Sequence, residues 1–350
     1  MPRRSLPSGD RKTGGRAREA TPGLVSVVVA SYNHAVYLDR RMQGLLDQTY
    51  PHLEILAIDD CSPDGSVDVL RRYESDPRVR LVVRETNGGW VAVSNQGLEL
   101  ATGEYVIFAN CDDDCEPRMI ERLVDSLERH RDAGVAFCRS VKIDSRDRVT
   151  GDDFSVRSRS FRTRCAADTF IPRKEMRRFL LHSCVIPNLS AALMRVACVD
   201  RCGGFTKAYR ACSDWDLFLR IADDFDFAYV CEALNRFRQH EATVRSATAG
   251  QVTLDEFLRV LLGEVARGSL DAGDRTRGRY RAMYLWAMDL VRPTVAGVAA
   301  FRHHLARVSE IDPTALCWLG PAIAHRAAEV AVKSAGRAAG MFGGSRTARE

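Results

Sequence analysis

The feature that most constrains the fold is an alternation of short apolar runs and helical patterns over residues 24–138. The first run, LVSVVVA at 24–30, is continuous and β-branched, which is typical of a strand buried on both faces. We expect strands at 24–30, 53–58, 79–83, 105–109 and 135–138, and helices at 36–48, 66–73, 89–101 and 117–130. This alternation predicts an α/β fold with a doubly wound, mostly parallel sheet.

Changes of pattern divide the chain into four parts. We expect a disordered basic leader at 1–22, an α/β domain at 23–246, a helical C-terminal region at 247–342 and a disordered tail at 343–350. Inside the domain, residues 144–172 lose all periodicity and are expected to form a long loop or a variable insertion. Further elements are expected at 191–196, 214–222, 227–230, 254–266, 279–291, 295–308 and 322–339.

Charge and composition exclude several classes of protein. Six Lys/Arg in the first twenty residues, opposed only by Asp10 and Glu19, account for +4 of the net charge of +5. The remainder is nearly neutral, so we expect no nucleic-acid partner. No apolar run reaches the roughly 18 residues of a membrane-spanning helix. The eleven cysteines lack paired C-x-x-C spacing, which favours free thiols in a reducing cytoplasm over a zinc site.

Polar clusters follow four of the expected strands. They are Ser31-Tyr32-Asn33, the run that opens with Asp59-Asp60, Asn87-Gly88-Gly89, and Asn110-Cys111-Asp112-Asp113-Asp114. Ligands of such sheets bind beyond the carboxyl ends of the strands. Because Mg²⁺ and Mn²⁺ prefer oxygen ligands and leave positions for substrate phosphates, the last cluster predicts a divalent cation site.

Three segments together carry a resemblance to a known family. They are the opening VSVVVASYNHAVYLDRRMQGLLDQTYPHLEILAIDDCSPDGS, the stretch NGGWVAVSNQGLELATGEYVIFANCDDD, and IPNLSAALMRVACVDRCGGF followed by SDWDLFLRIA. In this order they resemble the family 2 glycosyltransferases, which have the GT-A fold. The resemblance spans residues 24–240 and implies an inverting, non-processive enzyme. Such an enzyme moves a sugar from a nucleotide diphosphate donor, here a UDP-sugar, to an acceptor hydroxyl on a sugar or a lipid-linked carrier.

The resemblance also implies which residues bind the donor. Asp60 would bind the nucleotide base, and Asn87 and Gly88 would lie near the ribose and diphosphate. The full nucleotide-binding set it implies is Ala30, Ser31, Tyr32, Asn33, Asp59, Asp60, Asn87, Gly88, Cys111 and Asp112. Mn²⁺ or Mg²⁺ would be held by Asp112, Asp113 and His240, and Arg238 would bind the diphosphate. The first acid of the family's metal motif falls on Asn110, which carries no charge.

The family's catalytic base follows a Gly-Gly-Phe turn, here at 203–205. The resemblance therefore implies Asp214 as the base, with Ser213 in place of the usual glutamate. Asp216 is the rival, because residues two apart on a helix point to different faces. Trp215 and Asp216 are expected to contact the acceptor, although core packing explains a tryptophan equally well.

Other functions fit the sequence less well. A dehydrogenase would need G-x-G-x-x-G after the first strand, and a sugar nucleotidyltransferase would need a Gly-rich, Arg-containing loop there. The Gln-x-x-Arg-Trp motif of processive synthases is absent. A non-catalytic sugar-nucleotide-binding scaffold stays open, since Asn110 and Ser213 both weaken motif positions.

The alanine-rich stretch at 315–341 leaves two partner hypotheses open. One is a peripheral contact with the inner face of a membrane, and the other is packing within the chain or in a homodimer.

Overall fold

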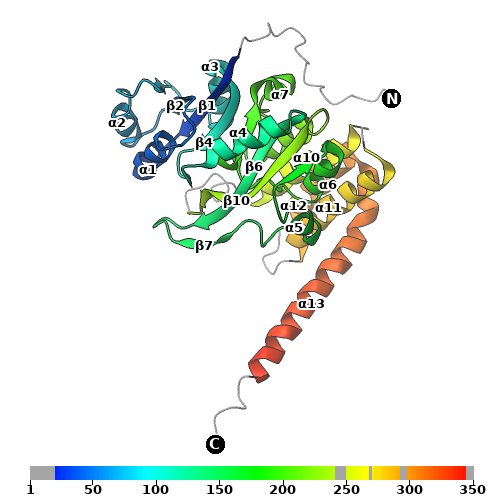
Figure 1. Ribbon diagram of the computed structural model, residues 1–350. Helices are drawn as coiled ribbons and strands as arrows, with labels where there is room; N and C mark the ends of the chain where they lie inside the picture. Colours follow the sequence, from blue (N-terminus) through cyan, green and yellow to red (C-terminus); the bar gives the residue numbers. More distant parts are fainter. Residues whose placement is uncertain (1–19, 241–249, 268–269, 292–297, 344–350) are drawn as a thin grey trace, which may run out of the picture. The chain divides into compact units, whose positions relative to one another are not determined.

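The computed structural model describes residues 20–240, 250–267, 270–291 and 298–343, without the side chains of 251 and 333–343. Most of the expected leader and nearly all of the expected tail lie outside the described residues. Contacts divide the chain into two compact units, Met1–Ser246 and Ala247–Glu350. Figure 1 shows the chain from blue to red, with the sheet in its first unit.

The first unit is built on a ten-stranded sheet. Its order is β3-β2-β1-β4-β9-β6-β10-β5, with β7 paired to β6 and β8 to β10. The strands are β1 (Thr21–Ser31), β2 (Leu53–Asp59), β3 (Val79–Val83), β4 (Gly103–Asn110), β5 (Asp114–Cys115), β6 (Ala133–Ile143), β7 (Val149–Asp152), β8 (Thr169–Ile171), β9 (Ala192–Arg195) and β10 (Asp226–Arg238). The pairs β2–β3, β1–β2, β1–β4 and β6–β10 are parallel.

A short antiparallel strand joins the two parallel parts of the sheet. β9 lies between β4 and β6 and runs antiparallel to both. Apart from such short strands the long strands run parallel, and the expected α/β fold with a mostly parallel sheet is confirmed. The strand expected at 135–138 is part of β6, and β9 separates it from β4.

Helices connect the strands of this unit. They are α1 (Ala35–Leu46), α2 (Ser66–Arg71), α3 (Trp90–Leu100), α4 (Met119–Arg129), α5 (Arg159–Arg164), α6 (Arg173–His182), η1 (Leu189–Ala191), α7 (Val196–Arg201) and α8 (Ser213–Ile221). The helices expected within 36–130 are present as α1 to α4, with ends that differ by a few residues.

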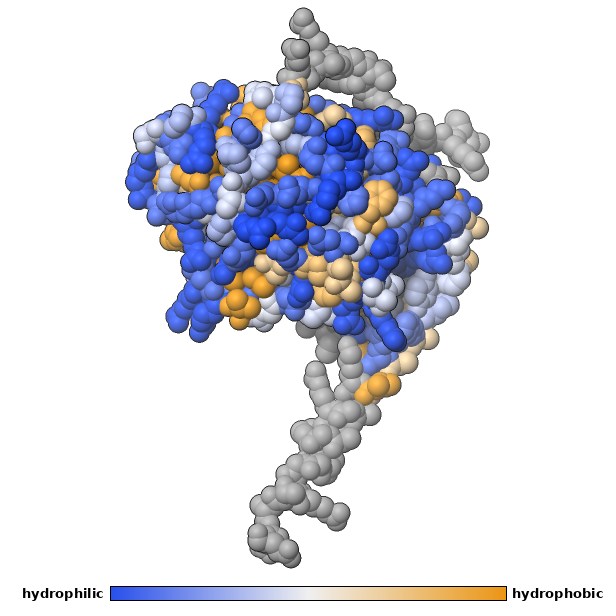
Figure 2. Space-filling view, viewed as in Figure 1, coloured by the Kyte–Doolittle hydropathy of each residue, from blue (hydrophilic) through white to orange (hydrophobic). Residues whose placement is uncertain are grey.

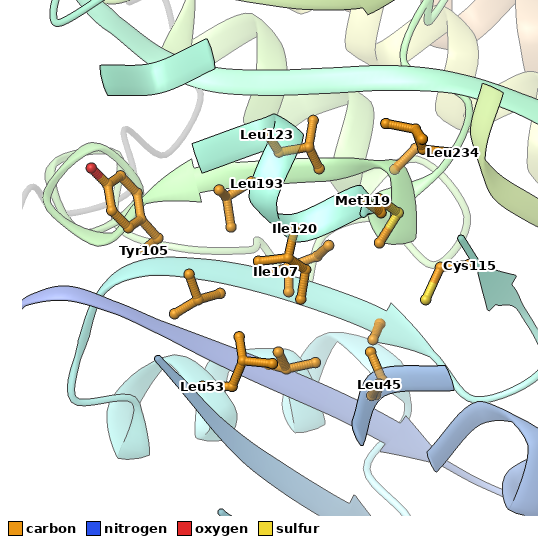
Figure 3. Close-up of a cluster of buried hydrophobic side chains, with 14 of the residues drawn as sticks. Leu45, Leu53, Tyr105, Ile107, Cys115, Met119, Ile120, Leu123, Leu193 and Leu234 are labelled. Carbon is orange, nitrogen blue, oxygen red and sulfur yellow. The ribbon is translucent and has the colours of Figure 1, made fainter. Parts of the chain in front are cut away.

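The main core lies where α1 and α4 cover one face of the sheet (Figure 3). Leu45 from α1 and Leu123 from α4 are fully buried in one cluster with Ile107 of β4. Burial of a side chain of this size contributes about 1.5–3 kcal/mol. On the other face, α3 packs closely against β1. A Cβ at Gly97 would overlap the side chain of Val28, so only glycine allows this approach.

The expectation of a long loop at 144–172 is wrong. This segment contains β7, α5 and β8, which pair with or pack beside the sheet. Such short elements bury little surface by themselves and form because β6 and β10 offer free edges. Their sequence therefore carries no periodic signal of its own.

The second unit is helical. Its elements are α10 (Gly250–Ala266), α11 (Ala272–Leu290), α12 (Val298–Ile311), η2 (Pro313–Trp318) and α13 (Leu319–Gly343). Within it, α11 packs against α10 and α13, and the side chain of Trp286 is fully buried.

The face in Figure 2 is largely hydrophilic, and no helix among the described residues is both long and apolar enough to cross a membrane. In α13, Val330 and Val332 are exposed. The peripheral membrane contact and the homodimer both stay predictions.

Candidate active site

The parallel strands bring three of the polar clusters to one edge of the sheet. The strand register places Ser31 beside Asp59 and Ala30 beside Asn110. Beyond these ends Tyr32 is exposed, and Asn33 adopts a left-handed conformation with φ of 56°. The backbone therefore turns at the carboxyl end of β1.

Asp60 fixes the loop that follows the third strand. Its carboxylate accepts the backbone N–H groups of Gly88 at 2.9 Å and Gly89 at 2.7 Å, and it forms a 2.8 Å ion pair with Arg84. Only 2% of its side chain is exposed. Asp60 thus shapes the loop of Asn87 and Gly88, and the base contact predicted for it stays a prediction. Sequence reasoning missed Arg84, which no motif marks.

Asp59 has an internal role of the same kind. It is fully buried and accepts hydrogen bonds from the Ser62 N–H at 2.9 Å and the Ser62 hydroxyl at 2.5 Å. These contacts hold the loop after β2, where Cys61 has a left-handed φ of 62° and an exposed thiol. Asp59 therefore fixes the conformation of the loop that follows β2.

Three side chains converge beyond the ends of β1, β4 and β10. One ligand atom each from His34, Asp112 and His240 lies within 4.8 Å of the other two. His240 Nε2 is 2.9 Å from Asp112 Oδ2. Burial alone would raise the pKa of Asp112, but the hydrogen bond from His240 and the charges of both histidines hold it below its ordinary value.

The orientation of His34 suits a metal ligand. Its Nδ1 lies 2.6 Å from the backbone oxygen of Tyr32, which can only accept, so Nδ1 carries the proton. Its Nε2 is buried and has no hydrogen-bond partner among the described residues. In the neutral ring the lone pair of this nitrogen is available, and the three side chains then fit a divalent cation. Sequence reasoning missed His34, because a single histidine carries no signal by itself.

Asp113, by contrast, is the centre of a hydrogen-bond network. Its Oδ1 accepts the backbone N–H of Arg238 at 2.9 Å. Its Oδ2 accepts three side-chain donors: Asn110 at 3.1 Å, Asn188 at 2.6 Å and Ser190 at 2.6 Å. Both oxygens are thus occupied within the protein. The metal role predicted for Asp113 has no geometric support, and the contacts favour a role in joining β4, η1 and β10.

Arg238 is committed to the protein as well. Its guanidinium donates to the backbone oxygens of Asp112 at 2.6 Å and Asp144 at 2.7 Å, and it pairs with the carboxylate of Asp147 at 2.5 Å. Only 2% of the side chain is exposed. The diphosphate role predicted for Arg238 therefore stays a prediction, and its contacts indicate that it positions Asp112.

Two more cations neighbour the Asp112–Asp114 cluster. Arg40 pairs with both Asp114 and Asp147 at 2.8 Å. Arg41 is fully buried, and its charge acts on Asp113 and on the thiol of Cys115. These arginines offset the acidic cluster from the side of α1.

The candidate base Asp214 lies in the first turn of α8 and is partly exposed. Its rival Asp216 is 8% exposed and pairs with Arg220 at 2.8 Å. Trp215 is 5% exposed, and its indole N–H donates to the backbone oxygen of Leu180 at 3.0 Å. The geometry favours Asp214 over Asp216 and gives the acceptor roles predicted for Trp215 and Asp216 no support.

The turn before α8 is tied to α3. The side chain of Asn95 bonds both the N–H (2.9 Å) and the C=O (2.8 Å) of Phe205. A Cβ on Gly204, which has φ of +70°, would lie 2.8 Å from this amide. Trp90, next to the Gly88-Gly89 loop, donates its indole N–H to the backbone oxygen of Arg210 at 2.7 Å. These contacts join the chain that carries Asp214 to the loop that Asp60 holds.

Comparisons with known proteins identify the family of the chain. Residues 26–201, just over half of the chain, match the family described as glycosyl transferase family 2. Glycosyltransferase GlyG of Streptococcus pneumoniae is 36% identical over 139 residues, which cover 38% of this chain and 46% of GlyG. The chain spans less than two thirds of the length of the curated relatives it matches.

Two solved structures show the same fold at low sequence identity. Staphylococcus aureus TarS in complex with UDP-GlcNAc is 16% identical with a TM-score of 0.66, covering 87% of this chain and 88% of that one. A mannosyltransferase of Pyrobaculum calidifontis, in complex with GDP-Man and Mn²⁺, is 17% identical with a TM-score of 0.50, covering 86% of each chain.

Proposed function

The chain belongs to glycosyltransferase family 2, and from this membership we propose that it moves a sugar from a UDP-sugar to an acceptor hydroxyl with inversion at the anomeric carbon. The observation that carries the proposal is the convergence of His34, Asp112 and His240 beside the edge where Asp59 and Asp60 order the loops. A divalent cation leaves positions for diphosphate oxygens, and the ligands of such sheets bind beyond the carboxyl ends of the strands.

The proposed base is Asp214. A carboxylate that accepts the proton of the acceptor hydroxyl makes the oxygen a better nucleophile as it attacks the anomeric carbon. Attack from the side opposite the leaving diphosphate inverts that carbon. Asp214 is partly exposed at the start of α8, whereas Asp216 is 8% exposed and pairs with Arg220.

The donor side is proposed to be built by the ordered loops. Asp60 and Arg84 hold the Gly88-Gly89 backbone, and glycine lets that backbone approach a ribose or phosphate closely. When bound, a divalent cation held by His34, Asp112 and His240 would offset the negative charge that builds up on the leaving diphosphate. The complexes of the two solved structures contain UDP-GlcNAc and GDP-Man, and they guide the choice of donors to test.

The acceptor is proposed to be a sugar or lipid-linked hydroxyl, as in the assembly of a cell-surface polysaccharide or glycoconjugate. The family membership supports a carbohydrate product in general. A panel of candidate acceptors can be tested once a donor that binds has been identified.

The test is a donor panel measured in two ways. Thermal shift with Mn²⁺ and UDP-GlcNAc, other UDP-sugars or GDP-Man should raise the melting temperature for at least one donor. The same donor should slowly release nucleoside diphosphate, since water replaces an absent acceptor. A shift without release would support the non-catalytic scaffold. No shift with any donor would contradict the proposed function.

A further inference from the structure

The segment that leads into α8, residues 203–213, is joined to that helix by its own hydrogen bonds. The hydroxyl of Ser213, the first residue of α8, donates to the backbone oxygen of Thr206 at 2.8 Å. The guanidinium of Arg220, also on α8, donates to the backbone oxygen of Gly204 at 2.9 Å. The segment and the start of α8 therefore form one unit, and the candidate base belongs to it.

Side chains of α3 hold the same segment from outside. Trp90, the first residue of α3, donates its indole N–H to the backbone oxygen of Arg210 at 2.7 Å. Further along the helix, the amide of Asn95 accepts the N–H of Phe205 at 2.9 Å and donates to its C=O at 2.8 Å. The rings of Trp90 and Phe205 meet edge to face, with their centroids 5.6 Å apart. Helix α3 thus fixes the segment at both Phe205 and Arg210.

The start of α3 is also part of the nucleotide side of the candidate site. Residues 88–89 directly precede Trp90, and Asp60 accepts their two N–H groups at 2.9 and 2.7 Å. A tryptophan side chain has only two rotatable bonds, so an indole on a fixed backbone is a rigid anchor. The bond from Trp90 to Arg210 therefore connects the loop that Asp60 orders with the segment that carries the candidate base.

We propose that Trp90 is a positioning residue that sets the place of Asp214 relative to the Gly88-Gly89 loop. A displacement of about 1 Å in a group that must meet a reacting atom can lower a rate about 100-fold. Loss of the bond to Arg210 should therefore slow transfer and leave nucleotide binding unchanged. The inference rests on the proposed function only for the role of Asp214 as the base.

Two replacements at position 90 of the full-length chain remove the donor and keep an aromatic ring. Trp90→Phe retains a ring beside Phe205. Trp90→benzothienylalanine replaces the indole N–H by sulfur and otherwise keeps the shape of the side chain. Trp318→Phe is the matched control, because Trp318 is also partly buried and meets another ring, that of Tyr280, at its edge in the second unit.

Hydrogen exchange followed by mass spectrometry tests the contact without any substrate. Peptides that cover residues 206–212 should exchange about fivefold faster in both Trp90 replacements, which corresponds to the loss of about one hydrogen bond. Peptides from β1 and β4 should be unchanged. Trp318→Phe should leave the exchange of 206–212 unchanged as well.

Turnover tests the effect on the base. It is measured as release of UDP from UDP-GlcNAc with Mn²⁺, or of the nucleoside diphosphate from another donor that binds in the panel. Both Trp90 replacements should lower kcat about 10- to 100-fold, whereas KM for the donor and the affinity for UDP should change less than about twofold. A residue that only bound the nucleotide would raise KM instead.

The outcomes separate this inference from the proposed function. Unchanged exchange of 206–212, or faster exchange throughout the first unit, would overturn the inference. So would a normal kcat, or a loss of UDP affinity as large as the loss of kcat. If only Trp90→Phe has an effect, the ring and not the N–H is responsible, and the inference fails.

The proposed function can fail separately. If 206–212 exchanges faster as expected but the unaltered chain turns over no donor, the positioning contact is confirmed and the proposed function is wrong. Circular dichroism melts establish that each variant is folded.

Discussion

The Nε–H of Arg238 donates to the backbone oxygen of Asp112 across 2.6 Å. This bond joins the end of β10 to the loop after β4. Arg238 also holds Asp147 of the β6–β7 turn, which in turn pairs with Arg40 of α1. A buried arginine thus fixes the backbone of a proposed metal ligand through a fork of donors that lysine does not have.

Arg238→Lys should therefore weaken Mn²⁺ binding about tenfold or more, as loss of a positioning contact typically does. Arg236→Lys is the matched control, because Arg236 is on the same strand but pairs with Glu116 and is 32% exposed. Titration with Mn²⁺ measures both variants. Equal losses in the two variants would contradict a positioning role specific to Arg238.

Asp214→Asn should lower kcat about 10²- to 10⁴-fold, because an amide cannot accept the acceptor's proton. The affinity for the nucleotide, measured by calorimetry with UDP and Mn²⁺, should stay the same. Asp216→Asn is the comparison, since it breaks only the pair with Arg220 and should cost stability more than turnover. If Asp216→Asn abolishes transfer while Asp214→Asn does not, the base is Asp216.

The rate at which the Cys61 thiol is alkylated should report nucleotide binding. Its thiol is exposed and directly follows Asp60, whereas burial raises the pKa of thiols such as Cys138. Because the thiolate is the reactive form, iodoacetamide should label exposed Cys61 and Cys317 first. UDP with Mn²⁺ should slow the labelling of Cys61 only, as followed by peptide mass spectrometry. Equal protection of Cys317 would indicate a general effect instead of an occupied site.

Asp64 links the starts of α1 and α2, and its effect on stability should depend on pH. Its carboxylate accepts the N–H groups of Ala35 and Ser66 at 3.0 Å. Desolvation alone would raise the pKa of Asp64, but these bonds and that of the Ser66 hydroxyl hold it below its ordinary value. A carboxyl with a lowered pKa in the folded state stabilises above its unfolded pKa, and the effect is lost as pH falls through the folded value.

Asp64→Ala should thus lower the free energy of unfolding at pH 7 by about 1 kcal/mol, a typical cost of losing a cap. The difference from the original chain should shrink below about pH 4. Urea unfolding at pH 7 and below pH 4 measures the difference in free energy. Asp68→Ala is the control, since Asp68 is 84% exposed and makes only a long ion pair of 3.7 Å with Arg71. A difference that is independent of pH would show that the carboxylate charge is not involved.

Local patterns explain which parts of the fold were predictable. The runs that became β1, β2 and β4 are apolar apart from Ser26 and Glu54, and that property belongs to the sequence alone. The insertion of β9 between β4 and β6 was missed, because strand pairing depends on residues far apart in the chain. For the same reason β7 and β8 were taken for loop, as each forms only against an existing strand edge.

The sequence by itself determined the α/β architecture and the acids at the ends of its strands, since both follow from periodicity and from the direction of parallel strands. Only the tertiary structure decided which of those groups remain available to a ligand. Asp113 and Arg238 proved to be occupied by internal hydrogen bonds, and His34 proved to have a buried, unpartnered nitrogen within the described structure. Hydrogen-bond partners are chosen by distance in space, and sequence patterns do not record that distance.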